Sequence, residues 1–444
     1  MMMPNLENHD AEIAGLLLAE EARQRHGFTL IPSENHASKA VLEALSSVMS
    51  DKYAEGYPGK RYYAGNIIAD QLEILVQNRA KELFKVPYAN VQAYSGSPAN
   101  LAIFAAALEP GDGIMGLYLL DGGHLTHGWK FSMTSKFWKS IPYHMTDQGM
   151  FDMEEIRRVA LENKPKIIIC GGTAIPREIP FRKFAEIAEE VGAFLLADIS
   201  HISGLVAGGA HESPVAYADI VMTTTHKTLR GPRGALIMVT DKGLEKDTEL
   251  PAKIDKAIIP RLQGGPHLNT IAGIGVALHE ASLPVFKDYA EQIVKNAAAL
   301  AEALKRHQFR LVSGGTDNHL ILLDLTPGGA GRGVFFHEAL ERINIFTNKN
   351  TIPGDPSSPF YPSGLRIGTP AVTTRGMKED DMQKIADWIY RVSEHMADIH
   401  LPDEKEARKQ VIKGFRASLD SDGFYNEMQS EVIVFSQNFP VPGI

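Results

Sequence analysis

The chain of 444 residues is too long for one compact core, so we expect two domains. Hydrophobic residues make up 44% and charged residues 22%, values that are typical of a globular protein and exclude a disordered or collagen-like chain. The net charge of -9 gives no broad positive field, which argues against nucleic acid as a partner.

The single cysteine, Cys170, excludes an intrachain disulfide. The first ten residues, MMMPNLENHD, lack the basic and then apolar pattern of a secretory signal. No apolar run approaches the roughly 20 residues that a membrane-spanning helix needs. We therefore expect a cytoplasmic protein without a membrane segment.

From about residue 80 to 240, short β-rich runs alternate with helical patterns, which predicts a largely parallel sheet covered by helices. Apolar residues at helical spacing over Phe181–Val191, followed by Gly192 as a cap, predict one crossover helix. The clearest strands are Asn90–Tyr94, Ile114–Leu120, Lys166–Cys170, Phe194–Ile199, Ile220–Thr225 and Ala235–Val239. The pattern indicates an α/β fold.

The last part of the chain has the pattern of a smaller α+β domain. A helix over Tyr289–Leu304 is followed by the strand His319–Leu325, by a helix over residues 382–396 and by a mostly helical tail. We expect a domain change near residues 280 to 310. The predicted organisation is an N-terminal arm or helix over 1–40, a large domain over 41–285 and a small domain over 286–444.

Two residues follow buried strands at the edge where open α/β sheets bind ligands. Asp198 ends one apolar run, and Lys227 follows another in the sequence Thr223-Thr224-Thr225-His226-Lys227. A buried lysine can lose its proton and attack a carbonyl, and a nearby acid can hold the ring nitrogen of pyridoxal phosphate. The pair predicts a pyridoxal-phosphate site, although Asp198 alone could equally be a solvated strand-end residue.

The phosphate of such a cofactor needs backbone N–H groups at a helix start. The sequence Ser95-Gly96-Ser97 follows a predicted strand and precedes the apolar run Leu101–Leu108. The same sequence by itself also fits a plain helix cap. Together with Asp198 and Lys227 it favours phosphate binding.

Other polar residues admit both a functional and a structural interpretation. His124 could stack on a cofactor ring, Glu55 could transfer protons and Arg366 could bind a substrate carboxylate. A loop histidine, a solvated glutamate and a surface ion pair are the alternatives. His124 and His127 are three residues apart, but no motif for a metal is present, so we expect no metal site.

Read together, these residues resemble the serine hydroxymethyltransferase (glycine hydroxymethyltransferase) family. The resemblance runs from about Leu30 to Gly376. Its blocks are Ser33-Glu34-Asn35, the loop Tyr53–Tyr63, Asn90–Asn100, Gly122–Gly128, Asp198–Val206, Thr223–Gly234, Gln263–Pro266 and Thr347–Gly376.

The resemblance implies fold type I, the aspartate-aminotransferase type, with a mainly parallel seven-stranded sheet in the large domain. It also implies a homodimer with shared active sites and leaves open whether dimers pair into tetramers. The reaction it implies is the reversible conversion of L-serine and tetrahydrofolate to glycine and 5,10-methylenetetrahydrofolate with pyridoxal 5'-phosphate as cofactor.

The resemblance also assigns roles to individual residues. Lys227 would hold the cofactor as a Schiff base, with the catalytic residues Glu55, Tyr63, Thr224 and His226 around it. The cofactor would contact Asp198, His201, His124, Ser95, Gly96, Ser97 and Arg233, together with Tyr53, Gly264 and Gly265 from the partner subunit. The amino acid would contact Ser33, Arg366 and His201, together with Tyr63 and Glu55 from the neighbouring chain. The folate would contact Leu119, Gly123, Leu125, Asn350, Ser358, Pro359 and Phe360.

The chain departs from the family pattern at three places near the cofactor. Ala64 replaces a usual glycine and is followed by Asn66-Ile67, Ile175 replaces a usual tyrosine, and Ser200 replaces a usual alanine and would put a hydroxyl on the pyridine face opposite His124. These changes motivate a first alternative, an enzyme with another substrate such as an α-methylserine hydroxymethyltransferase, a threonine aldolase or a transaldolase. A second alternative is a non-enzymatic role, against which the intact Lys227 and Asp198 argue.

Overall fold

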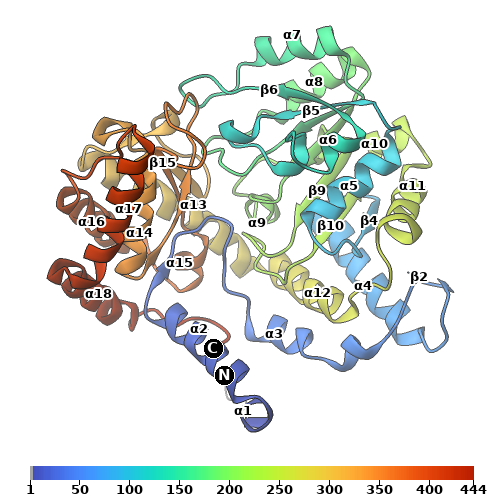
Figure 1. Ribbon diagram of the computed structural model, residues 1–444. Coiled ribbons are helices and arrows are strands. Elements are labelled where there is room, and N and C mark those ends of the chain that lie inside the picture. Colours follow the sequence, from blue (N-terminus) through green and yellow to red (C-terminus); the bar gives the residue numbers. More distant parts are fainter. Residues whose placement is uncertain (1–3) are drawn as a thin grey trace. The chain divides into compact units, whose positions relative to one another are not determined.

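The computed structural model describes residues 4–444 (Figure 1). Contacts divide these residues into two compact units, one of residues 40–291 and the other of residues 4–39 together with 292–444. The first three residues of the predicted arm lie outside the described residues. The predicted domain boundaries, at 40/41 and 285/286, stay a prediction.

The unit of residues 40–291 is built on the seven-stranded sheet that the resemblance implies. Its strand order is β4-β10-β9-β8-β7-β5-β6. Neighbours from β9 to β6 are parallel, whereas β10 is antiparallel to both of its neighbours. The strands are β4 (Tyr88–Asn90), β5 (Gly113–Leu117), β6 (Lys139–Tyr143), β7 (Ile167–Cys170), β8 (Phe194–Asp198), β9 (Ile220–Thr224) and β10 (Ala235–Val239).

The bounds of the first strand differ from the prediction. The sequence predicts a strand over Asn90–Tyr94, but β4 ends at Asn90. The Asn90 side chain accepts the backbone N–H of Gln92 at 2.9 Å, so this N–H is not available to a neighbouring strand. The chain then runs without further strand pairing to the start of the next helix.

Helices cover both faces of this sheet. α5 (Gly96–Ala107) and α11 (Leu250–Lys256) share one buried cluster with Ile167, Leu196 and Ile220 of the strands. Strand side chains alternate between faces, so the equally buried Ile168, Leu195 and Val221 belong to the opposite face. The other helices of this unit are α3 (Lys39–Leu45), α4 (Ile67–Phe84), α6 (Thr134–Phe137), α7 (Met153–Asn163), α8 (Phe181–Val191, as predicted), α9 (Ser203–Ala207), α10 (Asp241–Lys246) and α12 (Leu268–Ser282).

The second unit has a four-stranded antiparallel sheet in the order β11-β12-β15-β14. Its strands are β11 (Arg310–Leu311), β12 (Leu320–Asp324), β14 (Asn348–Asn350) and β15 (Gly364–Gly368), and β1 (Phe28–Thr29) pairs separately with β13 (Ile345–Phe346). The helices are α1 (Pro4–His9), α2 (Ala11–Arg25), α14 (Gly333–Arg342), α15 (Pro370–Thr374), α16 (Glu379–His395), α17 (Lys405–Ser421), α18 (Gly423–Ser436) and the larger part of α13 (Pro284–Arg306).

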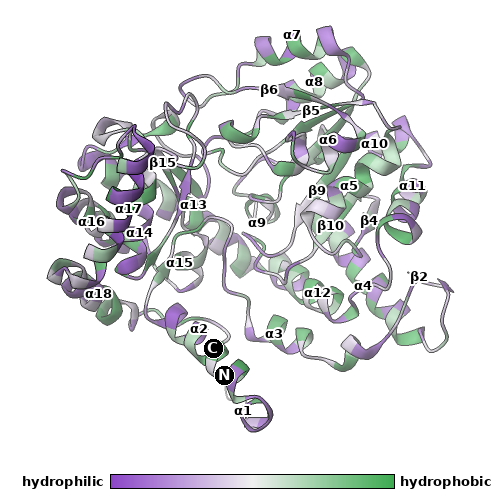
Figure 2. Cartoon of the chain, viewed as in Figure 1, coloured by the Kyte–Doolittle hydropathy of each residue, from purple (hydrophilic) through white to green (hydrophobic). Residues whose placement is uncertain are grey.

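Three of the helices carry hydrophilic as well as hydrophobic residues along their length (Figure 2). Figure 2 shows hydrophilic residues along α7, α16 and α17, with hydrophobic residues on the same helices. Trp388 and Ile389 of α16, by contrast, are completely buried. Among residues 4–444, no helix combines the length and the apolar character that crossing a bilayer requires.

Candidate active site

A pocket lies at the carboxyl ends of β8 and β9. Asp198 ends β8, and Lys227 follows the end of β9 by three residues. The sheet topology therefore brings together the two residues that the sequence singles out. The residues that line the pocket are Gly96, Asn100, His124, His127, Gly172, Thr173, Asp198, Ser200, His201, Met222, Thr224 and Lys227.

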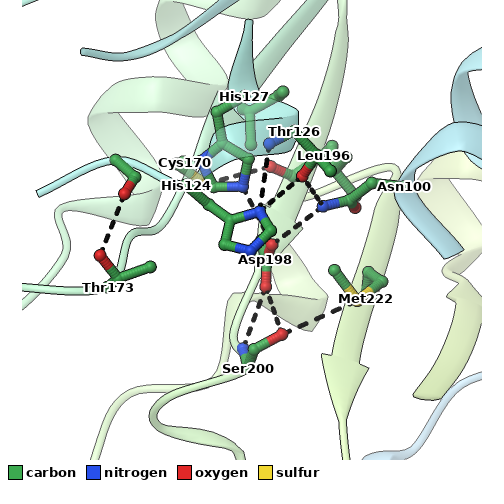
Figure 3. A network of polar contacts seen from close by, with 12 residues as sticks. Asn100, His124, Thr126, His127, Cys170, Thr173, Leu196, Asp198, Ser200 and Met222 are labelled. Atoms are coloured by element: carbon green, nitrogen blue, oxygen red, sulfur yellow. Dashed lines mark hydrogen bonds and ion pairs between the residues drawn. The ribbon is translucent and has the colours of Figure 1, made fainter. Parts of the chain in front are cut away.

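The Asp198 carboxylate is held by several hydrogen bonds. Figure 3 shows the side chains of Asn100, His127 and Ser200 converging on it. One oxygen, Oδ2, lies 3.0 Å from Nε2 of His127 and accepts Nδ2 of Asn100 at 3.2 Å. The other, Oδ1, accepts the hydroxyl of Ser200 at 2.6 Å and its backbone N–H at 3.1 Å.

These contacts decide the charge of the pocket. Burial by itself would raise the pKa of Asp198, but the hydrogen bond and charge of His127 and the hydrogen bond of Ser200 lower it to well below its ordinary value. Asp198 is therefore ionised at neutral pH. A buried carboxylate in this state suits a partner that carries a proton or a positive charge.

The imidazole of His124 lines the same pocket and is neutral. Burial and the neighbouring His127 lower the pKa of His124 to about 4. Its Nδ1 atom contacts the Thr126 hydroxyl at 2.8 Å, which fixes the ring (Figure 3). A flat, neutral and fixed ring beside Asp198 can stack on an aromatic cofactor.

The residues around Lys227 fall partly inside the pocket. Thr224 and His201 line it, whereas His226 and Arg233 do not. His226 is half-buried, and burial together with the charges of Lys227 and Arg233 lowers its pKa to about 3. His226 is thus a neutral neighbour of the lysine.

The predicted phosphate site is the start of α5. Ser95 is the N-cap residue, and its side chain makes no capping hydrogen bond, so the first N–H groups of the helix are available to an anion. Gly96 is buried, and a Cβ at this position would lie 2.8 Å from Cγ2 of Thr224. Ser97 is exposed. Close packing of the helix start against Thr224 therefore requires the glycine.

The residues predicted to serve a neighbouring subunit gather in a second cluster, formed by Tyr53, Glu55, Tyr63, Gly264 and Gly265. Tyr53 donates to Oε1 of Glu55 at 3.2 Å, and its ring lies 4.9 Å from that of Tyr63. A Cβ at Gly265 would lie 3.2 Å from the Tyr53 ring. Of the described residues, none in this cluster lines the pocket at Asp198.

Six of the predicted substrate and folate residues lie in the second unit and are described within it. Arg366 is on β15, its Nε donates to Oδ1 of Asn348 at 3.0 Å, and burial lowers its pKa to about 10. The turn that holds Ser33 is next to the end of the same strand, where N–H of Gly368 donates to Leu30 at 2.7 Å. Further along this unit are Asn350 on β14 and the loop Ser358–Phe360.

The remaining predicted folate residues lie in the first unit. Leu119 begins a 3-10 helix after β5, and Leu125 begins another two residues after Gly123. A Cβ at Gly123 would lie 2.0 Å from the carbonyl oxygen of Leu117, so only glycine fits there. Leu125 is half exposed and can meet a ligand.

Sequence reasoning missed two residues that bind the Asp198 carboxylate. His127 was considered as a metal ligand, and Asn100 was named only as the last residue of the block Asn90–Asn100, yet both contact Asp198. The sequence signal for His127 was its spacing of three residues from His124. Asn100 is one turn into α5, and only the fold brings it beside β8.

The three departures from the family pattern take different positions. Ser200 lines the pocket. Ile175 is buried, and its Cδ1 lies 2.8 Å from where a Cβ of the pocket residue Gly172 would be. Ala64 is exposed and lies in the loop that continues from Tyr63. Only the first places a new polar group in the pocket.

The lysine and the ionised acid suit the Schiff base and the ring nitrogen of pyridoxal phosphate, and the flat imidazole and the helix start suit its ring and its phosphate. The fold and the pocket thus define the class of fold type I pyridoxal-phosphate enzymes. The sequence model of the serine hydroxymethyltransferase family matches residues 6–389. The chain belongs to this family, whose enzymes use pyridoxal phosphate and take tetrahydrofolate as co-substrate.

Individual relatives agree with the family match. The chain is 53% identical to a serine hydroxymethyltransferase of Acidothermus cellulolyticus over 98% of this chain and 96% of that protein. It is 49% identical to one of Sorangium cellulosum, over 99% and 97% of the two chains. It is 50% identical to one of Desulfotalea psychrophila, over 89% and 91%. The predicted fold class, family and cofactor are confirmed.

Proposed function

We propose that this chain catalyses the reversible reaction of L-serine and tetrahydrofolate to glycine, 5,10-methylenetetrahydrofolate and water. The observation that carries the proposal is the pocket in which Lys227, the ionised Asp198 and the neutral His124 meet at neighbouring strand ends. Pyridoxal phosphate, when bound, supplies an electron sink for the bond that breaks at the α-carbon. The protein residues position it and move protons.

In this proposal Lys227 holds the cofactor covalently and Asp198 pairs with its ring nitrogen. His124 would stack on the ring, and the start of α5 would bind the phosphate. His201, Thr224, His226 and Arg233 surround the lysine. Ser33 and Arg366 bind the amino acid, because a guanidinium can contact a carboxylate through two parallel hydrogen bonds.

Tyr53, Glu55, Tyr63, Gly264 and Gly265 complete the site from a second subunit of a homodimer. The separation of this cluster from the pocket at Asp198 supports shared sites. Exposed apolar residues near the cluster also support an interface, namely Tyr62, Ile67, Ile68, Ile74 and Leu75. Glu55 would transfer the proton during hydroxymethyl transfer. We place the protein in the cytoplasm, where its single buried Cys170 stays reduced.

The visible spectrum of the purified protein with glycine, before and after addition of tetrahydrofolate, tests the proposed reaction. A long-wavelength band that grows with folate is expected. Cofactor absorbance without a response to folate would contradict the folate-dependent reaction. Lys227→Ala serves as the control, because it removes the covalent link to the cofactor.

Ser200 and Ile175 favour a second candidate, an enzyme of the same family with another β-hydroxy amino acid as substrate. The comparison that separates the two is kcat/KM for serine against α-methylserine and threonine. A clear preference for either of the latter two would select the second candidate.

A further inference from the structure

The side-chain amide of Gln263 joins the glycine loop Gly264–Gly265 to the segment that leads into α5. Its Oε1 accepts the backbone N–H of Tyr94 at 3.0 Å, and its Nε2 donates to the carbonyl oxygen of Gln92 at 2.8 Å. This segment lies beyond the end of β4, so the amide pairs two backbone groups there as a neighbouring strand would. The two contacts together fix the position and the orientation of the Gln263 side chain.

The glycine loop has further contacts with the same segment. The hydroxyl of Tyr94 donates to the carbonyl oxygen of Gly265 at 2.6 Å, and the Tyr94 ring stacks on that of His267 at 4.1 Å. The backbone N–H of Gln263 donates to Ile258 at 2.9 Å. Glycine has more conformational freedom than any other residue, so a glycine loop needs contacts of this kind to keep one conformation.

The conformation of such a loop matters because backbone N–H groups bind an anion only when they point to one place. A Cβ at Gly264 would lie 3.3 Å from Oε1 of Glu55, and one at Gly265 would lie 3.2 Å from the Tyr53 ring. The loop thus lies within the cluster around Tyr53. It contributes no lining residue to the pocket at Asp198.

We infer that Gln263 is a positioning residue that acts on the active site of the partner subunit. Its amide holds Gly264–Gly265 in the conformation whose N–H groups bind the phosphate of the cofactor in that site. This role rests on the proposed contribution of both glycines to the second subunit and adds the side chain that shapes their loop. Gln263 is bonded to Tyr94, next to the phosphate site of its own subunit, yet its substitution should weaken binding in the other.

Absorbance titration of the apo protein with pyridoxal phosphate, and separately with pyridoxal, tests this role in Gln263→Met. The variant has a side chain of similar length but lacks both hydrogen bonds to the segment before α5. The dissociation constant of pyridoxal phosphate should rise about tenfold, equivalent to about one hydrogen bond, and that of pyridoxal should change by less than about twofold. An unchanged constant for pyridoxal phosphate, or an equal rise for both ligands, would overturn the inference.

Gln429→Met is the matched control. Gln429 is also half-buried, and its Nε2 donates to the carbonyl oxygen of Arg342 at 3.1 Å, in the second unit. This variant should bind both ligands as the wild type does. If it weakens pyridoxal phosphate as much as Gln263→Met does, the effect of Gln263 is one of general stability and the inference fails. Should Gln263→Met not fold, Gln263→Asn, which stays polar but is one methylene shorter, replaces it in every titration.

Mixed dimers show in which subunit Gln263 acts. Gln263→Met and Lys227→Ala subunits with different affinity tags are refolded together, and the mixed dimer is isolated through both tags. Its one pocket with Lys227 belongs to the Gln263→Met subunit and receives the glycine loop from the subunit with intact Gln263. Absorbance of the covalently bound cofactor reports on this pocket alone, and its dissociation constant should equal that of the wild type. A rise as large as in the Gln263→Met homodimer would overturn the inference.

Gly264→Pro separates this inference from the proposed function, because it removes one N–H group of the loop itself. The variant should bind pyridoxal phosphate weakly. If Gly264→Pro and Gln263→Met both bind it as the wild type does, the proposed role of the loop fails. If Gly264→Pro weakens binding and Gln263→Met does not, only the role of Gln263 fails.

Discussion

His127 Nε2 lies 3.0 Å from Asp198 Oδ2, and both side chains are almost fully buried. Since the carboxylate only accepts, Nε2 must carry the proton of the imidazole. We predict that His127→Ala raises the dissociation constant of pyridoxal phosphate by about 10-fold to 100-fold, the range for losing a hydrogen bond to a buried charge. Absorbance titration of the apo protein with the cofactor measures this constant.

A histidine and aspartate pair elsewhere provides the control. His395 and Asp422 are 2.7 Å apart but each about one third exposed, in the second unit. His395→Ala should leave cofactor binding unchanged. Equal weakening in both variants would mean that His127 acts through general stability and not through Asp198.

If each active site is formed by residues of two subunits, two inactive variants should complement each other in a mixed dimer. Lys227→Ala disables the pocket at Asp198, and Glu55→Gln disables the cluster around Tyr53. Each variant alone should have little serine cleavage activity. A mixture in equal amounts, unfolded and refolded together, should recover about one quarter of the wild-type activity, because half of the dimers contain one intact site of two.

The recovered activity depends on exchange between subunits. The same two proteins mixed without unfolding should stay inactive while the dimers persist. The double variant with both Lys227→Ala and Glu55→Gln, refolded together with the wild-type protein, controls for the refolding yield. No recovery from the refolded mixture would show that Lys227 and Glu55 act in the same subunit.

The sequence predicted the large sheet well because its central strands are buried on both faces. Ala235–Val239 and Phe181–Val191 have the predicted bounds, since continuous apolar runs and a capping glycine mark their ends. Asn90 shows where this reasoning stops. Its side chain ends the strand through a contact with Gln92, and the pattern of apolar residues does not predict such a contact.

The candidate site was predicted in the same uneven way. Asp198 and Lys227 follow buried strands, and the end of a buried strand can be recognised from the sequence pattern. The residues that contact them cannot be recognised in this way. Asn100 is 98 residues away from Asp198, and their hydrogen bond follows from strand order alone. The end of the loop Tyr53–Tyr63 makes another contact that the residue pattern did not predict, the buried ion pair of Arg61 with Glu73 at 2.6 Å.

The low pKa values of His124 and His226 predict sensitivity to acid. The unfolded chain takes up protons at these residues near pH 6.5, whereas the folded chain does so only near pH 4 and pH 3. Between these pH values the unfolded state binds more protons than the folded state. The free energy of unfolding therefore falls as the pH falls, by at most about 1.4 kcal/mol per pH unit for each residue.

Urea unfolding of the apo protein at pH 7 and pH 5 measures this loss. His124→Asn should show a smaller decrease in the unfolding midpoint than the wild type. Val434→Ser, a change of an exposed apolar residue, should show the wild-type decrease. An identical decrease in all three proteins would contradict the assignment to His124.

Gly96 gives the sharpest test of the phosphate site. A Cβ at this position would lie 2.8 Å from Cγ2 of Thr224, at the start of a helix whose N-cap side chain makes no hydrogen bond. Gly96→Ala should therefore displace the N–H groups that bind the phosphate. We expect at least about a tenfold rise in the dissociation constant of pyridoxal phosphate, equivalent to one hydrogen bond to a charged group.

Binding of pyridoxal, which lacks the phosphate, distinguishes an effect on the phosphate site from an effect on the rest of the pocket. Its weaker binding should change much less in Gly96→Ala, because pyridoxal makes none of the phosphate contacts that the variant displaces. Gly414→Ala is the control, since nothing lies within 4 Å of a Cβ there and it is inside α17. That change should leave cofactor binding unaltered and stabilise the helix by about 0.5–1 kcal/mol. If Gly96→Ala weakens both ligands equally, the start of α5 does not hold the phosphate.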